Sequence, residues 1–260
     1  GEFSILNFYA RRARRILPAL FFVMFVSSVF AWLWLMPSHL KEFSKSLIAV
    51  SVFVSNIFFW YESGYFDTAA ELKPLLHTWS LAVEEQYYVF FPIFLMLTWR
   101  FGKRWIAASL AVLAIISLAL AQWGSFSNPE ATFYLLHTRG WELLIGALAA
   151  FYLSKVNKVD VSNVVREGCA ALGLVLILYS VFIYNKHTPF PGLYALVPTL
   201  GTLLIILFAV KDTVVGKLLG LKLFVGIGLL SYSAYLWHQP LFAFARYKNI
   251  SELSDVAYIA

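Results

Sequence analysis

The strongest constraint on this chain is the number of long apolar runs in it. Residues 17–36 contain no charged side chain, and a helix needs roughly 20 apolar residues to cross the hydrocarbon core of a bilayer. Residues 105–123, 168–184, 192–210 and 223–245 form four further apolar runs. Only 13% of the residues are charged, whereas soluble domains average about 25%. These features predict an all-α, polytopic transmembrane helix bundle.

Two more predicted spans, residues 79–99 and 131–153, are apolar except for a few charged side chains. Residues 46–61 are apolar but short, so they either cross the bilayer at a tilt or enter it and return to the same side. The bundle then contains about seven or eight spans. The sequence shows no internal repeat and no linker, so we expect residues 1–260 to form a single membrane-embedded domain.

Basic residues gather in alternate loops, which indicates how the chain is oriented. Because basic loops remain in the cytoplasm, we expect the clusters there, and residues 124–130 and 185–191 outside. If residues 46–61 crossed fully, the first two clusters would lie on opposite sides. Either this segment is re-entrant or the charge rule fails locally. The four clusters hold 13 of the 20 Lys and Arg residues: Arg11, Arg12, Arg14 and Arg15; Arg100, Lys103 and Arg104; Lys155, Lys158 and Arg166; Lys211, Lys217 and Lys222.

The same orientation rule accounts for the net charge of +6, so no nucleic-acid partner is predicted. Cys169 is the single cysteine; it excludes an internal disulfide and fits a small packed residue. None of the five histidines has a zinc-type spacing such as HExxH. We therefore predict neither a metal site nor a permanently bound cofactor.

The stretch HTWSLAVEEQYY, residues 77–88, carries polar groups into an apolar span. Charged groups inside a membrane helix are costly unless they are paired or face water, which makes them candidates for function. On a helix, His77, Ser80, Glu84 and Tyr88 share one stripe, whereas Glu85 points to another face. A histidine and a carboxylate on one stripe can relay a proton or orient a substrate hydroxyl. Alternatively, the two glutamates favour the helix dipole and His77 makes a structural hydrogen bond.

Two later stretches repeat this kind of pattern. Arg139 and Glu142 are three residues apart, so they can pair within a helix, or the arginine can face a phosphate or thioester carrier. In SYSAYLWHQPL, residues 231–241, a stripe at offsets of four and seven is formed by Ser231, Tyr235 and His238.

The stretch FYARRARRILPAL, residues 8–20, combines four arginines with the start of an apolar run. These arginines either anchor the first span on its cytoplasmic side or hold the phosphates of a nucleotide-like donor.

Four stretches taken together resemble one family: FYARRARRILPAL, PLLHTWSLAVEEQYYVFFP, RGWELLIGA and SYSAYLWHQPL. In this order and spacing they resemble the acyltransferase family 3, bacterial integral-membrane O-acyltransferases that modify surface glycans such as lipopolysaccharide O-antigen. The resemblance runs from residue 3 to about residue 247. It implies transfer of an acyl group, often acetyl, from cytoplasmic acyl-CoA to a glycan hydroxyl at the outer face of the bacterial inner membrane. Members begin with earlier helices, so it also implies a fragment truncated at both ends and inactive alone.

The resemblance implies a role for each of the polar stretches. Glu84, with His77, would act on the acceptor hydroxyl, and the donor phosphates would be held by Arg11, Arg12, Arg14 and Arg15. The passage between donor and acceptor would be lined or shaped by Trp79, Ser80, Glu85, Tyr88, Arg139, Glu142, Ser231, Tyr235 and His238.

A transporter or flippase for a lipid-linked sugar or a small anion is the alternative, with the same polar groups as its pathway. Such proteins often contain inverted repeats with paired broken helices, and the sequence shows neither, which favours the enzyme. A membrane scaffold without chemistry leaves the intramembrane charges unexplained.

Overall fold

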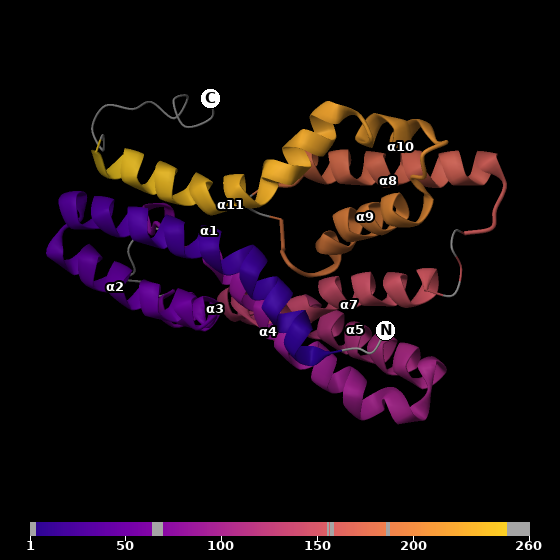
Figure 1. Cartoon of the computed structure of the whole chain (residues 1–260), viewed down its shortest axis with the longest axis horizontal. Helices are drawn as coiled ribbons and strands as arrows, with labels where there is room; N and C mark the ends of the chain where they lie inside the picture. The colour runs from indigo at the N-terminus through magenta and orange to yellow at the C-terminus, as the bar shows by residue number, and fades with distance from the viewer. Residues whose placement is uncertain (1–3, 64–69, 155, 157–158, 186–187, 249–260) are drawn as a thin grey trace. The chain divides into compact units, whose positions relative to one another are not determined.

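The computed structural model describes residues 4–63, 70–154, 156, 159–185 and 188–248, and every regular element among them is a helix. The all-α prediction is confirmed. Lys155 and Lys158 of the third basic cluster lie outside the described residues. In chain order (Figure 1), the elements are α1 (Ile5–Trp34), α2 (Pro37–Ser51), α3 (Ser55–Glu62), η1 (Ala70–Leu72), α4 (Thr78–Thr98), η2 (Trp99–Phe101), α5 (Lys103–Ser127), α6 (Pro129–Tyr134), α7 (Leu136–Leu153), α8 (Asn163–Ile183), η3 (Leu193–Ala195), α9 (Leu196–Phe208), α10 (Val214–Leu219) and α11 (Lys222–Lys248).

The chain forms two compact units. Unit 1 comprises residues 1–86 and 230–260, and unit 2 comprises residues 87–229. The helices α4 and α11 therefore each contribute to both units. That all 260 residues act as one domain stays a prediction.

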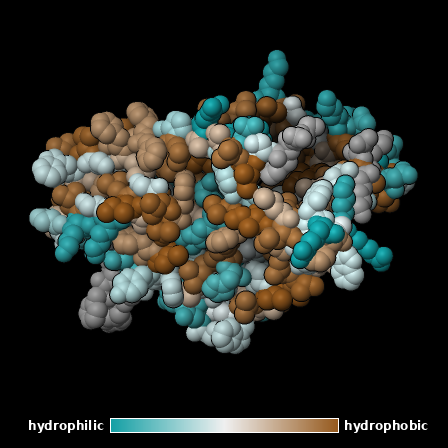
Figure 2. Space-filling view, turned by 60° about the horizontal axis from the view of Figure 1, so that its bottom comes forward, coloured by the Kyte–Doolittle hydropathy of each residue, from teal (hydrophilic) through white to brown (hydrophobic). Residues whose placement is uncertain are grey.

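By length and composition, three described helices can cross a membrane: α1, α5 and α8. The shorter helix that continues from η3 through α9 is also apolar. Large apolar side chains are exposed on these helices, for example Trp32 at 77% and Phe182 at 79%. Figure 2 shows apolar residues over wide areas of the face that it presents. Such surfaces suit contact with lipid tails and not with water.

Unit 1 is built around α1 and α11, which pack side by side and run in the same direction (Figure 1). The Tyr232 hydroxyl donates to the Ile16 carbonyl at 3.1 Å, and the ring of Phe244 lies 5.9 Å from that of Phe30. Along these contacts, residue numbers increase in the same direction on both helices, so the two helices are parallel. Polar groups on the inner side of α11 therefore face α1 and the segments packed against it.

The α2–α3 hairpin, residues 37–62, settles how the short apolar segment at residues 46–61 is folded. The helix stops at Ser51, and Phe53 adopts a left-handed conformation with φ of 55°. The chain then turns back, because Lys45 Nζ lies 3.6 Å from Glu62 Oε1 although the two residues are 17 apart in sequence. The structure thus folds this segment as a helical hairpin; that it returns to the same side of the membrane stays a prediction.

The tip of this hairpin is tied to α4 by an amide pair. Gln86 Nε2 donates to the Asn56 Oδ1 at 2.8 Å and to the Phe53 carbonyl at 2.9 Å. Asn56 is almost fully buried, and buried amides require such partners. The pair therefore ties α4 to the hairpin at the position that directly follows Glu84 and Glu85.

Unit 2 contains two close helix pairs, α5 with α7 and α8 with α9. At the second pair, a Cβ added to Gly173 would lie 2.7 Å from the Gly201 carbonyl oxygen, so only glycine permits this approach, as is usual between membrane helices. At the first pair, Trp141 is fully buried and its backbone N–H donates to Ser117 Oγ at 3.1 Å.

Candidate functional site

The candidate site of unit 1 is built around His77, in the turn that leads into α4. Hydrogen bonds in this turn join residues three apart, as in Thr78 N to Leu75 O at 3.1 Å, and such tight turns are common at helix starts. His77 is buried with 7% exposure. Its ring makes edge contacts with the rings of Tyr235 at 5.1 Å and His238 at 5.2 Å. Two of the three residues on the predicted stripe of α11 thus contact His77.

Hydrogen bonds to Tyr235 join α11 to the start of α4. The Tyr235 hydroxyl donates to the His77 carbonyl oxygen at 2.6 Å. Because its single proton is used there, it accepts from Ser80 Oγ, which lies 2.9 Å away. This network holds His77 through its carbonyl oxygen, and the imidazole takes no part in it.

The imidazole of His238 has a defined tautomer. Its Nδ1 lies 2.6 Å from the Tyr235 carbonyl oxygen, and a carbonyl oxygen can only accept, so Nδ1 carries the proton. Nε2 is then an unprotonated acceptor in the neutral ring. His238 is an exposed residue.

Burial keeps His77 in its neutral form. Desolvation is the main cause that lowers the pKa of His77 to about 3, and the nearby His238 lowers it further, while the Leu236 and Pro74 backbone groups oppose the shift. Neither ring nitrogen makes a well-aligned hydrogen bond within the described part of the chain. A neutral, buried imidazole can accept or donate one proton to a group that enters beside it.

The two adjacent glutamates of α4 have different environments. Glu85 Oε1 lies 3.0 Å from a guanidinium nitrogen of Arg12, and both side chains are partly buried. Glu84 is exposed and makes no hydrogen bond or ion pair with the described residues. The structure also begins α4 at Thr78 and buries His77 in the preceding turn. Their spacing predicted that His77 and Glu84 share one helical stripe; in the structure His77 is buried and Glu84 is exposed.

The four arginines at the start of α1 do not act as one group. Arg12 is bound to Glu85, whereas Arg11, Arg14 and Arg15 are exposed. Their binding of a donor stays a prediction. Among the other residues that the sequence analysis selected, Trp79 and Tyr88 are half-buried in α4 and Ser231 is exposed in α11.

Further polar contacts continue along α11 beyond His238. Gln239 Nε2 donates to the Lys73 carbonyl oxygen at 3.1 Å, and Arg246 forms an ion pair with Glu71 at 2.8 Å. Tyr247 shares a hydrogen bond with His39 of α2. We call these contacting groups of unit 1 the polar column: Arg12, Glu85, Tyr232, Ser80, Tyr235, His77, His238, Gln239, Lys73, Glu71, Arg246, His39 and Tyr247.

Sequence reasoning missed seven members of this column: Tyr232, Gln239 and Arg246 of α11, and also His39, Glu71, Lys73 and Tyr247. A signal for the first three was present, because offsets of three, seven and fourteen place Tyr235, Gln239 and Arg246 on the same face of a helix as Tyr232. The sequence analysis did name Arg12, but as a residue that binds the donor phosphates. Nothing local marks it as the partner of Glu85, which is 73 residues away.

Unit 2 contains the other predicted pair. Arg139 and Glu142 of α7 form an ion pair at 3.3 Å, which confirms that they pair within the helix. The Arg139 guanidinium also lies 4.8 Å from the centre of the Phe190 ring. A cavity lined by Glu142, Thr199 and Thr202 lies between α7 and α9. Among the described residues, no group of three or more His, Cys, Asp or Glu side chains could hold a metal ion.

Comparison with known proteins identifies the family. The acyltransferase domain that defines the acyltransferase family 3 matches residues 1–255. The chain belongs to this family. The predicted resemblance is therefore confirmed across both units of the acyltransferase.

Several relatives of this acyltransferase are about one-third identical to it. An uncharacterized protein of Haemophilus influenzae is 33% identical over 214 residues, which cover 79% of this chain and 87% of that protein. The O-acetyltransferase OatA of Staphylococcus aureus is 32% identical over 262 residues, covering 94% and 42%. The peptidoglycan O-acetyltransferase OatA of Listeria monocytogenes is 31% identical over 250 residues, covering 90% and 39%. The acyltransferase thus spans about two fifths of the length of the two OatA proteins. No solved structure gives a significant match.

The His77–His238 cluster contains groups of the kinds that acyl transfer to a hydroxyl uses. Acyl transfer to a hydroxyl needs a base that takes the proton and donors that stabilise the developing oxyanion. In its neutral form His238 has an unprotonated Nε2, and the centre of the neutral His77 ring lies 5.2 Å from the centre of the His238 ring, whereas the Ser80 and Tyr235 hydroxyls use their protons within their own network. All of these groups come from unit 1.

Proposed function

We propose that this multi-pass membrane protein transfers an acetyl group from acetyl-CoA in the cytoplasm to a hydroxyl of a cell-envelope glycan. The observation that carries the proposal is the His77–His238 cluster, set within a polar column between α1, α4 and α11 in a member of an acyltransferase family. The names of the OatA relatives support acetyl as the acyl group. They favour peptidoglycan as the acceptor over the lipopolysaccharide O-antigen suggested by the family resemblance.

In the proposed reaction, the acceptor hydroxyl lies against His238 Nε2. Its oxygen forms a bond to the acetyl carbon while its proton passes to Nε2, and the C–S bond of the thioester then breaks. The proton is finally given to the departing thiolate, so the ring returns to its starting state. The fixed Nδ1 proton, held by the Tyr235 carbonyl, stabilises the imidazolium that forms between these steps.

Glu84 and His77 keep their predicted roles in this proposal, with one refinement. His77 is buried and neutral, so it is suited to donating a hydrogen bond to the oxyanion and not to acting as the first base. Glu84 is exposed and without an ion pair, so its carboxylate is available to orient the acceptor. Its negative charge also favours the imidazolium of His238 when that forms.

On the donor side, we assign binding of the CoA phosphates to Arg11, Arg14 and Arg15, which are exposed, since guanidinium groups bind phosphate with two parallel hydrogen bonds. Arg12 differs, because its ion pair with Glu85 ties α1 to α4. Seven residues separate Arg15 from Phe22, whose ring contacts Trp237 beside His238. A rise of about 1.5 Å per residue makes this roughly 10 Å along α1. A donor held at the arginines therefore needs only a short reach to the cluster.

The proposal places the protein in the bacterial inner membrane, with the bilayer and the acceptor glycan as its partners. To test the function, membranes from cells that produce the protein are supplied with acetyl-CoA labelled in the acetyl group, and the label in the glycan fraction is measured. We expect transfer that depends on the protein. Loss of substrate uptake in a deletion strain whose glycan acetylation stays normal would instead show a transporter.

A further inference from the structure

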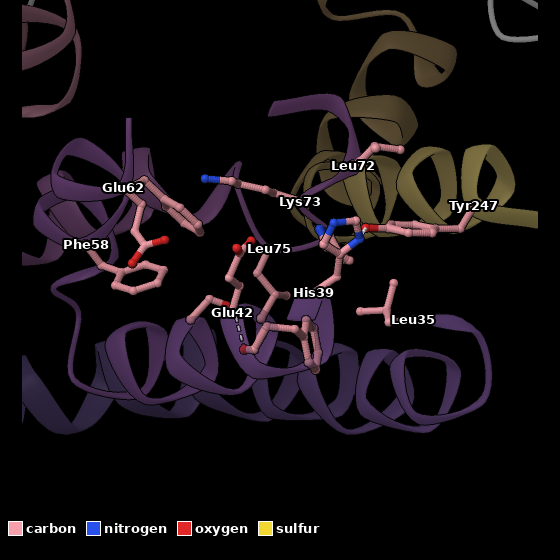
Figure 3. Close-up of a pocket in the computed structure, with 13 residues that line it drawn as sticks. Leu35, His39, Glu42, Phe58, Glu62, Leu72, Lys73, Leu75 and Tyr247 are labelled. Atoms are coloured by element: carbon pink, nitrogen blue, oxygen red, sulfur yellow. Dashed lines mark hydrogen bonds between the residues drawn. The ribbon is translucent and has the colours of Figure 1, made fainter. Parts of the chain in front are cut away.

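Two of the cavities in the molecule differ in what they can hold. The cavity of unit 1 beside His39 and Tyr247 (Figure 3) has about 20 Å³ of space, which is enough for one water molecule. A cavity of unit 2, where α4 ends and α5 begins, has about 250 Å³. A water molecule takes up about 30 Å³ in the liquid, and a methylene group is of similar size. The cavity of unit 2 can therefore hold a segment of an alkyl chain.

We call this second space the junction cavity, and its lining suits an apolar occupant. The hydroxyl of Thr98 donates to the Phe94 carbonyl oxygen at 2.7 Å. The hydroxyl of Ser109 donates to the Ile106 carbonyl oxygen at 2.9 Å. Because both hydroxyl protons are used within the chain, these two side chains add little polarity to the cavity. The lining consists of Thr98, Phe101, Trp105, Ile106 and Ser109.

Three basic residues at the same junction have no carboxylate partner. Arg100, Lys103 and Arg104 are exposed, and none of them forms an ion pair with another described residue. Residues 86–129 include no Asp or Glu. The Arg100 guanidinium lies 4.8 Å from the centre of the Phe101 ring, which lines the junction cavity. Uncompensated positive charge therefore lies beside an apolar cavity.

A short connection keeps these basic residues together. Only Gly102 separates η2 from α5, and its φ of 86° lies in the left-handed region that favours glycine. The first turn of α5 contains no acidic residue, although negative side chains are favourable at the start of a helix. The chain thus supplies no negative charge of its own at this point.

The predicted orientation places the junction at the cytoplasmic surface of the membrane. Trp99 and Trp105 are 59% and 70% exposed, and exposed tryptophans near the ends of membrane helices usually lie at the level of the lipid headgroups. Anionic lipids give the cytoplasmic leaflet its negative surface potential, and basic pockets between membrane helices on this side bind their headgroups.

We propose that the α4–α5 junction is a binding site for an anionic phospholipid of the cytoplasmic leaflet. Arg100, Lys103 and Arg104 bind the phosphate, and the two arginines can do so with parallel hydrogen bonds. The first part of one acyl chain fills the junction cavity. All of these residues belong to unit 2, and the proposal does not depend on the acetyl transfer.

The first test measures binding of phosphatidylglycerol to the purified protein in detergent by native mass spectrometry. Phosphatidylcholine, which has no net charge, is the comparison lipid and should bind more weakly. Phosphatidylglycerol should bind at least about tenfold more weakly, a loss of 1.4 kcal/mol, to the triple variant Arg100→Gln, Lys103→Gln and Arg104→Gln. A matched control removes the same charge from another exposed basic cluster and should bind as the parent does: Lys211→Gln, Lys217→Gln and Lys222→Gln.

A second pair of variants tests the place of the acyl chain. Ser109→Leu fills part of the junction cavity, and each methylene group of the lipid that it displaces lowers the affinity about fourfold. Binding of phosphatidylglycerol should therefore fall about tenfold. Ser109→Ala leaves the space open and should bind as the parent does. The unfolding temperature of each variant without added lipid shows that the protein is folded.

Several results would overturn the site. Equal binding of the two lipids by the parent protein would mean that the charge of the headgroup is not recognised. Equal losses in the two triple variants would show attraction by net charge alone. Unchanged binding in Ser109→Leu would show that no chain lies in the cavity. If the first triple variant lost binding of coenzyme A but kept that of phosphatidylglycerol, the basic residues would serve a nucleotide.

Discussion

The Nδ1 atom of His238 lies 2.6 Å from the Tyr235 carbonyl oxygen, and this contact decides which ring nitrogen meets a substrate. If Nε2 is the base, His238→Asn should lower the transfer rate by roughly 10²–10⁴-fold, the usual contribution of general base catalysis. The amount of protein in the membrane should stay unchanged because the side chain is exposed. His137→Asn, at an exposed histidine of α7, serves as the control in the same labelled-acetyl assay. Transfer at the parental rate in His238→Asn would remove this residue from the mechanism.

The adjacent residues Glu84 and Glu85 allow an effect on the transfer rate to be distinguished from an effect on stability. Glu84→Gln should reduce transfer by at least about two decades with unchanged abundance, because no partner of Glu84 is left behind. Glu85→Gln should instead lower the abundance of the protein, because it leaves the partly buried guanidinium of Arg12 without its carboxylate. For each variant, the acetyl-transfer rate per protein molecule and the amount of the protein in the membrane are both measured. A Glu84→Gln protein with full activity would remove this carboxylate from the mechanism.

The buried neutral form of His77 predicts how stability depends on pH. Its pKa is lowered to about 3 in the folded protein, from about 6.5 in an unfolded chain. Between these values the unfolded state binds more protons, so stability falls as the pH is lowered from about 6.5 toward 3, on the order of 1 kcal/mol per pH unit. Thermal unfolding in detergent should show a weaker pH dependence in His77→Gln across this window. Equal slopes in the two proteins would mean that His77 is protonated in the folded state.

At the scale of elements, the α2–α3 hairpin and the parallel packing of α1 and α11 agree on one topology. If the hairpin returns to the side from which it entered, and α4, α5, α7, α8 and α9 each cross once, then α11 crosses in the same direction as α1. A hairpin that crossed would make these helices antiparallel, whereas the Phe30–Phe244 and Phe22–Trp237 contacts require them to be parallel. The same topology places the basic clusters at residues 11–15 and 100–104 on one side.

This topology is tested by single cysteines in a protein whose Cys169 is replaced by alanine. Cysteines at Ser38 and Ser63, on either side of the hairpin, should both react with a membrane-impermeant thiol reagent in intact cells. A cysteine at Lys103 should react only after the cells are opened. If the cysteine at position 38 is labelled in intact cells and the cysteine at position 63 is not, residues 37–62 cross the bilayer.

At the scale of the whole molecule, periodic and local features were predictable from the sequence. The apolar runs gave α1, α5 and α8, and the offset of three gave the Arg139–Glu142 pair. The reversal at Phe53 was not determined, because neither glycine nor proline marks it. Long-range pairs such as Tyr232 with Ile16, 216 residues apart, follow from how helices assemble. Helical periodicity predicts on which face of its helix a side chain lies, but not which residue of another helix it contacts.

The order of the chain also determines when the candidate site can form. Unit 1 is split in sequence, so the partners of His77 and Ser80 on α11 are synthesised only after the whole of residues 87–229. At 5–20 residues per second this takes on the order of 10–30 s. During that interval α1 and α4 lie in the membrane without the tyrosines that later cover their polar groups. Residues 87–229 are synthesised in the meantime, and the site can form only after α11 has been made.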